Sequence, residues 1–165
     1  MNYFKLSVGI FIALAAARFI PHPPNFTSLL ALSFYIPLFF GRKYIFSILL
    51  SFFITDLFIG FHSITFFTWG SVVLIGLSFN FFINTLATRI MGSLSGACLF
   101  YIITNFGVWS QGSYGYSLNG IINCYTLALP FFTYSLISTL IYSGVIEVLF
   151  QNKTIKKYIS LSNSI

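Results

Sequence analysis

Side chains that can do chemistry are few in this sequence, and most of them gather at the ends of apolar runs. A proline-rich stretch after the first run holds Arg18, His22 and Asn25. Asp56 lies at the end of the third run, and His62 follows shortly after it. An arginine can hold a carboxylate or a phosphate through its planar, forked guanidinium group. These residues therefore predict a binding site for a small polar or anionic molecule.

The same residue types allow two other kinds of chemistry. His22, His62 and Asp56 could together bind zinc or a similar ion, and their spacing in the sequence does not decide the question. His22 and Asp56 could also serve a membrane-embedded enzyme. However, no H-E-x-x-H motif and no phosphate-binding loop is present, and the centre of GSLSG at residues 92–96 is Leu94 rather than serine. We therefore expect no enzymatic activity and no cofactor.

The composition decides what kind of protein could carry such a site. Of the 165 residues, 58% are hydrophobic and only 6% are charged. A soluble domain has about 25% charged residues, so this chain has too few charges for a water-soluble surface. Its apolar runs are long and continuous, whereas a membrane β-barrel has alternating segments of about ten residues. The predicted fold class is an all-α integral membrane protein, with membrane lipid and no nucleic acid among its partners.

Six transmembrane helices account for the apolar runs. A span needs about 20 apolar residues. The predicted spans form a single transmembrane domain over residues 1–165, and they cover residues 3–20, 25–41, 44–60, 66–87, 92–109 and 130–150. Residues 110–129 mix Gly, Ser, Asn and Tyr, so we expect a structured segment that lies on, or dips into, the outer face of the bundle.

The basic residues orient this six-helix bundle. With the N-terminus inside the cell, seven of the eight Lys and Arg residues fall on the cytoplasmic side, as the positive-inside rule requires. Both termini are then cytoplasmic, and only Arg18 lies at the outer ends of the spans. An alternative is a cleavable signal peptide that ends at Ala17, which would leave Arg18 as the new N-terminus and an odd number of spans.

Hydrogen-bonding and stacking side chains gather at the outer ends of the predicted spans. Asn105 and Trp109 end the fifth span, and the polar segment after it adds tyrosines and asparagines. Aromatic residues commonly mark a membrane interface, but a Trp beside an amide is also typical of a pocket for a planar ligand. The predicted ligand-binding residues are Arg18, His22, Asn25, Asp56, His62, Asn105, Trp109, Tyr116 and Asn119.

Arg18 and Asp56 have two possible roles. An ionisable side chain at membrane depth is costly, and it usually faces a partner or a water-filled cavity. Asp56 is the only acid at the depth of Arg18, because Glu147 lies near the cytoplasmic end of the last span. The two side chains could form an ion pair that only joins two helices, or Asp56 could orient Arg18 toward an anionic ligand.

Four blocks of sequence resemble a known family. RFIPHPPNFTSLLAL, TDLFIGFHS, TNFGVW and NGIINCYTLALPFF, in this order over most of the chain, are similar to bacterial membrane proteins assigned as substrate-binding (S) components of energy-coupling-factor transporters. The resemblance implies a six-helix S-component fold in the bacterial cytoplasmic (inner) membrane. It also implies a partnership with a transmembrane coupling protein and two ATPase subunits. The small residues Ala13 and Ala17 match the positions through which the first helix of such proteins docks on the coupling protein.

Two functions from different classes follow from these observations. The first is capture of a small polar or anionic vitamin-like solute at the outer face, as the substrate-binding subunit of an uptake transporter. The second is a structural or assembly subunit of a larger membrane complex, with no small-molecule ligand. A cavity that solvent can reach between Arg18, Asp56 and Trp109 would favour the transporter.

Overall fold

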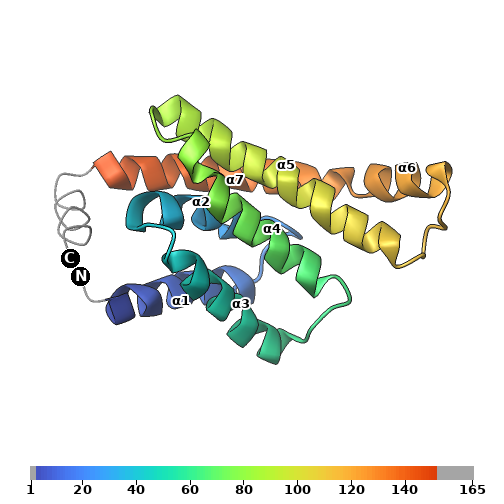
Figure 1. Cartoon of the computed structure of the whole chain (residues 1–165), viewed down its shortest axis with the longest axis horizontal. Coiled ribbons are helices and arrows are strands. Elements are labelled where there is room, and N and C mark those ends of the chain that lie inside the picture. Colours follow the sequence, from blue (N-terminus) through green and yellow to red (C-terminus); the bar gives the residue numbers. More distant parts are fainter. Residues whose placement is uncertain (1–2, 152–165) are drawn as a thin grey trace.

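The computed structural model describes residues 3–151, and this part of the chain is all-helical (Figure 1). Its elements are α1 (Tyr3–Phe19), α2 (Leu29–Phe40), α3 (Tyr44–Ile59), α4 (Thr65–Ser78), the short 3-10 helix η1 (Phe79–Phe81), α5 (Leu86–Ser110), α6 (Leu118–Leu127) and α7 (Leu129–Gln151). The prediction of an all-α chain is confirmed for these residues. Two of the helices, α5 and α7, are long and apolar enough to cross a membrane, and α2, α3 and α4 with η1 are apolar but shorter.

The boundary between the fourth and fifth predicted spans was wrong. Helix α4 ends at Ser78 rather than at residue 87, and α5 begins at Leu86 rather than at residue 92. Thr85 starts α5 through a capping box, in which its side chain accepts a hydrogen bond from the Thr88 backbone and the Thr88 side chain accepts one from the Thr85 backbone. Arg89 therefore lies in the first turn of a helix and not in a loop.

The start of the second predicted span also differs. Helix α2 begins at Leu29, four residues later than residue 25, because the chain bends through the prolines that precede it. Asn25 adopts a left-handed conformation with φ of 62° within this bend. Near the other end of the chain, Pro130 is the second residue of α7, where its missing N–H costs no helical hydrogen bond.

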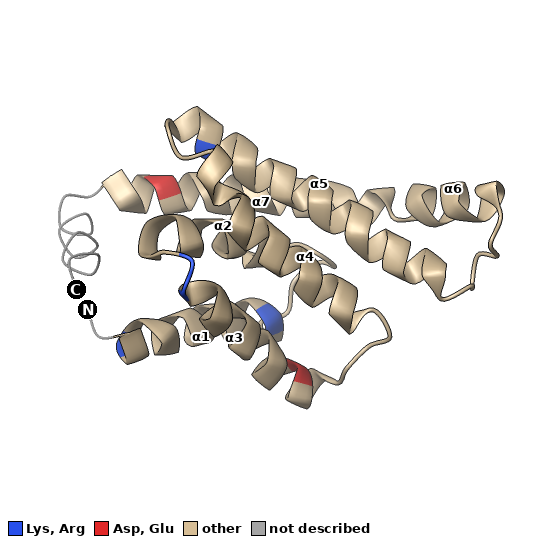
Figure 2. Ribbon diagram, in the orientation of Figure 1, with Lys and Arg blue, Asp and Glu red and all other residues tan. Residues whose placement is uncertain are grey.

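The helices run back and forth between two ends of the molecule. Helix α1 begins and α7 ends at the same end, which also holds Lys5, the Arg42–Lys43 turn and Arg89 (Figures 1 and 2). We call this the basic end. Among the Lys and Arg residues that the structure describes, only Arg18, in the last turn of α1, lies at the opposite end of the molecule. The positive-inside count also includes Lys153, Lys156 and Lys157. These three residues lie outside the described part of the chain.

Residues 110–129 fold as a turn followed by α6, which returns along α5 and leads into α7 through Ala128 (Figure 1). The described helices that α6 contacts are α5 and α7. Tyr101 and Tyr125 tie α5 to α6 reciprocally, since the Tyr101 hydroxyl donates to the Tyr125 carbonyl (2.6 Å) and the Tyr125 hydroxyl donates to the Ile102 carbonyl (2.7 Å). The segment is therefore structured, but it extends the α5–α7 hairpin and does not cover the other helices.

Small residues let the central helices approach one another closely. A Cβ atom on Gly96 would lie 3.0 Å from a side-chain carbon of Ile75, and one on Gly107 would lie 2.6 Å from Cγ of Phe67. Both glycines lie on α5 and face α4. Close contact at such small residues is the usual way in which membrane helices pack together.

Gly107→Ala is expected to destabilise the protein although alanine is the better helix former. The added methyl group would overlap the Phe67 ring near its attachment to the backbone, where the ring has little room to move, and overpacking of this kind costs about 1–3 kcal/mol. Gly144→Ala is the matched control, because its Cβ would meet nothing within 4 Å. Thermal unfolding in detergent should place Gly107→Ala below the wild type and Gly144→Ala at or above it. Equal melting temperatures for the two variants would contradict the close α4–α5 contact.

Candidate functional site

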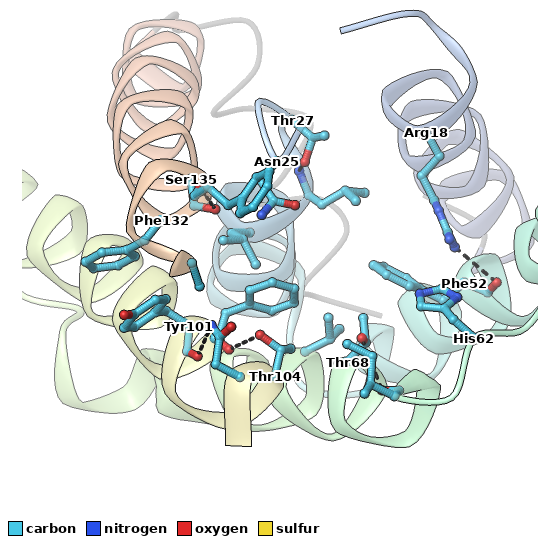
Figure 3. Close-up of a pocket in the computed structure, with 18 of the residues that line it drawn as sticks. Arg18, Asn25, Thr27, Phe52, His62, Thr68, Tyr101, Thr104, Phe132 and Ser135 are labelled. Carbon is cyan, nitrogen blue, oxygen red and sulfur yellow. Dashed lines mark hydrogen bonds between the residues drawn. The ribbon is translucent and has the colours of Figure 1, made fainter. Parts of the chain in front are cut away.

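A cavity of about 460 Å³ lies at the end of the bundle opposite the basic end (Figure 3). It is lined by residues of α1, the α1–α2 and α3–α4 connections, α4, α5 and α7, with contributions from α2 and α3. The polar lining residues are Arg18, His22, Asn25, Thr27, His62, Thr68, Tyr101, Thr104, Asn105 and Ser135, and the aromatic ones besides Tyr101 are Phe52, Phe100, Phe131 and Phe132. Figure 3 shows Arg18 and His62 on one side of the cavity, and Tyr101 and Ser135 on the other.

Arg18 extends from α1 along the surface of α3. Its Nη1 donates to Thr55 Oγ1 (2.6 Å) and to the Phe52 carbonyl (3.4 Å), and its Nη2 donates to Asp56 Oδ1. The guanidinium carbon lies 5.0 Å from the centre of the Phe52 ring, within range of a cation–π contact. The side chain is only 11% exposed, and Arg18 is one of the residues that line the cavity.

Asp56 lies behind Arg18 and does not line the cavity. The residue is 1% exposed, and its two carboxylate oxygens have different partners. One accepts from Arg18, and the other accepts from the indole nitrogen of Trp69 (2.9 Å). The ion pair that the sequence allowed is therefore present and joins α1 to α3, and the Trp69 hydrogen bond joins α4 to the same carboxylate. Nothing in the sequence signalled Trp69, because only the tertiary structure brings α4 against this end of α3.

The proline-rich bend brings two further predicted residues to the cavity. His22 lines it with one ring nitrogen, Nδ1, placed 2.8 Å from the Pro23 carbonyl. The left-handed conformation of Asn25 directs its carbonyl toward α7, where it accepts from Ser138 Oγ (3.4 Å). Thr27 accepts a hydrogen bond from the backbone N–H of Leu29, the first residue of α2 (3.3 Å).

Helices α4 and α5 supply polar groups that the sequence analysis missed. Tyr101, Thr104 and Asn105 share one face of α5, and each directs a polar group to a backbone carbonyl while the side chain lines the cavity. Asn105 was predicted as a ligand-binding residue. Thr104 counts among the polar residues at the outer end of the fifth predicted span, but neither it nor Tyr101 was predicted to bind the ligand. Their spacing of three and four residues was the available signal, since it places them on one side of a helix. Thr68 of α4 was missed for the same reason.

Besides Asp56, three further predicted ligand-binding residues do not line the cavity. The Trp109 indole donates to the Gly115 carbonyl (3.1 Å), and its ring meets Tyr116 edge-on at 5.9 Å. The Tyr116 hydroxyl points back to the Ser110 carbonyl, and Asn119 is exposed on α6. Trp109 lies in the last turn of α5, Tyr116 in the α5–α6 connection and Asn119 in the first turn of α6, so all three lie beyond the cavity.

The described part of the chain contains no cluster of side chains that could bind the metal ion considered as an alternative ligand. His22 and His62 both line the cavity, but no group of three His, Cys, Asp or Glu residues there is arranged to hold a metal ion. Both oxygens of Asp56 are already bonded. The cavity is suited to an organic molecule, which would contact aromatic rings and a few neutral hydrogen-bonding groups beside one paired arginine.

Comparisons with known proteins give one match. Neither a search of curated proteins nor a search of solved structures finds a similar protein. Residues 2–160 match the model of a family of unknown function, DUF6580. Because this match spans nearly the whole chain, the protein belongs to the DUF6580 family.

Proposed function

We propose that this protein is a six-span membrane protein that captures a small vitamin-like solute, as the substrate-binding subunit of an uptake transporter of the energy-coupling-factor type. The cavity is the observation that carries this proposal. Its volume of about 460 Å³ lies within the usual range for small-molecule sites, about 300–1,000 Å³. Arg18 is the charged anchor, held in place by Asp56, and His22 and Asn105 add hydrogen-bonding groups.

The distribution of side chains supports a membrane location. Large apolar residues are exposed on the outside of the helices, among them Phe4 at 71%, Phe58 at 78% and Phe66 at 83%. A monomer in water rarely exposes extended apolar surface, whereas lipid tails favour it. With the basic end in the cytoplasm, the cavity opens toward the outside of the cytoplasmic membrane of a bacterium, where an uptake protein meets its solute.

Single-cysteine labelling should show this orientation. The native Cys98 and Cys124 are first replaced by alanine. Ser113→Cys, in the α5–α6 turn, is then expected to react in intact cells with a maleimide that does not cross membranes. Lys5→Cys, at the basic end, should react only after the membrane is permeabilised, because the positive-inside rule places it in the cytoplasm. Labelling of Lys5→Cys from outside would reverse the orientation and point the cavity into the cell.

Solute capture is tested by native mass spectrometry of the protein purified in mild detergent. The proposal predicts a mass above that of the polypeptide, caused by a co-purified molecule that fits the cavity. A protein that carries no such molecule, but that co-purifies with other membrane subunits, would favour the assembly function. One feature supports that alternative: the tip of the α5–α6 hairpin exposes Tyr116 at 74% and Leu118 at 75%, beyond the other helices.

The two alanines proposed for partner docking have different surroundings. Ala13 is exposed on α1, whereas Ala17 is half-buried and lines the cavity. Ala13→Trp is therefore expected to block co-purification of a coupling protein and its ATPases while the solute stays bound, because close helix packing needs a small residue. Ile12→Trp, at the neighbouring exposed position, is the control. If both variants co-purify the coupling protein and its ATPases in equal amounts, Ala13 is not part of the docking surface.

A further inference from the structure

Helix α7 carries an unusual buried face. Its buried residues are all polar, and they are Ser135, Ser138, Thr139, Ser143 and Glu147. Four of them, Ser135, Thr139, Ser143 and Glu147, are spaced by four residues, so they form a line along one side of the helix. The outward positions of the same helix are mostly apolar. This is the reverse of the pattern that a soluble helix shows, and it places a line of oxygen atoms inside the bundle.

The line connects the cavity to the basic end. Ser135 lines the cavity. Twelve residues later, or about 18 Å along the helix, Glu147 is 3% exposed and forms a two-pronged ion pair with Arg89 of α5. The Arg89 Nε lies 2.6 Å from one carboxylate oxygen, and its Nη2 lies 2.7 Å from the other. The Arg89 side chain is 22% exposed, so this end of the line approaches the surface.

Neighbouring helices add hydroxyl groups to the same line. The hydroxyls of Ser93 in α5 and Ser143 lie 2.8 Å apart. Tyr35 of α2 is 1% exposed, and its hydroxyl interacts electrostatically with both Glu147 and Arg89. We call Tyr35, Ser93, Ser135, Thr139, Ser143 and Glu147 the polar seam.

Two hydroxyls of the polar seam make no hydrogen bond of regular geometry among the described residues, although the one on α2 interacts with both Ser143 and Glu147. They belong to Tyr35 and Thr139, and both are fully buried. A buried hydroxyl without a partner destabilises a fold, and the near-isosteric residues Phe and Val would avoid that cost. Such unsatisfied groups in a native fold commonly mark a buried water molecule or a functional role. Here the two orphan hydroxyls occur together, along the line that joins the cavity to a buried carboxylate.

We propose that the polar seam is a proton path between the cavity and Glu147. Each hydroxyl, with a water molecule in the gap to the next, accepts a proton on its oxygen and releases its own to the following group. The Glu147 carboxylate accepts the proton, becomes a neutral carboxylic acid and loses its ion pair with Arg89. It then releases the proton to water at the basic end, and the ion pair forms again. Ionisable residues inside a membrane bundle serve as proton relays in other proteins.

This inference rests on the membrane location proposed above, and it is tested in liposomes. The purified protein is reconstituted into vesicles of phosphatidylcholine and phosphatidylglycerol that contain the pH indicator pyranine. A potassium gradient with valinomycin then drives protons inward. The wild type is expected to acidify the interior faster than protein-free vesicles do. Thr139→Val and Tyr35→Phe should each lose this protein-dependent rate, because each variant removes one hydroxyl from the path.

The controls separate conduction from folding. Thr133→Val lies on α7 outside the polar seam, is exposed, and should conduct as the wild type does. Thr139→Val should unfold near the wild-type temperature, since the change leaves no protein group without a hydrogen-bond partner. A wild-type rate equal to that of empty vesicles, or an unchanged rate in both Thr139→Val and Tyr35→Phe, overturns the proposal. Release of the protein from vesicles by alkaline carbonate would instead refute the membrane location itself.

Discussion

Asp56→Ala is expected to lower the free energy of unfolding by about 3–5 kcal/mol, because it leaves the buried guanidinium group of Arg18 without its counter-charge. The substitution also removes the acceptor of the Trp69 indole, so α1, α3 and α4 lose their shared contact at the cavity end. The measurement is thermal or denaturant unfolding of the purified protein in detergent. A variant that melts within a degree or two of the wild type would show that the ion pair does not hold these helices together.

The double variant Arg18→Ala with Asp56→Ala is compared with the two single variants in the same unfolding measurement. Removing both charges should cost less than the sum of the two single substitutions, because neither charge is then left buried and unpaired. Arg18→Ala alone should lose both stability and solute binding, since Arg18 contacts Asp56 and lines the cavity. Loss of stability with normal solute binding would show that Arg18 is only structural.

Thr68→Trp is expected to weaken solute binding by about fivefold to 150-fold, because the solute must displace the indole at a cost of about 1–3 kcal/mol. Thr68 is half-buried on α4 and lines the cavity, so the larger ring enters space that the solute would occupy. In native mass spectra, the fraction of protein that carries a co-purified molecule should fall accordingly.

The matched control for this experiment is Thr133→Trp. Thr133 is exposed on α7 and does not line the cavity, so the same added ring should leave the bound fraction unchanged. Both variants should unfold near the wild-type temperature, which excludes a general loss of structure. Equal solute occupancy in both variants would place the binding site elsewhere and would remove the support that the cavity gives to the transporter proposal.

The sequence by itself determined the helical class and the approximate place of most helices. Both follow from local properties, namely continuous apolar runs and breaks at Gly, Pro and charged residues. The exception at residues 78–92 is also local in origin. A capping box at Thr85 started α5 early, and the apolar residues before it concealed that signal. Capping depends on two or three side chains, so it is easily missed within a long hydrophobic run.

The candidate site could be predicted only in part. Arg18, His22, Asn25, His62 and Asn105 line the cavity because each lies near the end of a helix, and a run of alternating helices brings such ends together. Trp109 lies near such an end as well, yet α5 is long enough to carry it past the cavity. Helix length and the depth of a residue in the bundle are set by packing between helices. The hydrophobic pattern of the sequence does not predict that packing.

Only the tertiary structure decided which polar groups are partners. Asp56 could be matched to Arg18 from the sequence because the chain offers so few charges, but Trp69 completes that site from a third helix. The serines and threonines of α7 appear in the sequence as ordinary residues of an apolar span. The fold shows that several of them point into the bundle, and that some lie near Tyr35 and Arg89. The physical reason is that a hydroxyl is tolerated on either side of a membrane helix, so its hydrogen-bond partners, and not its position in the sequence, determine what it can do.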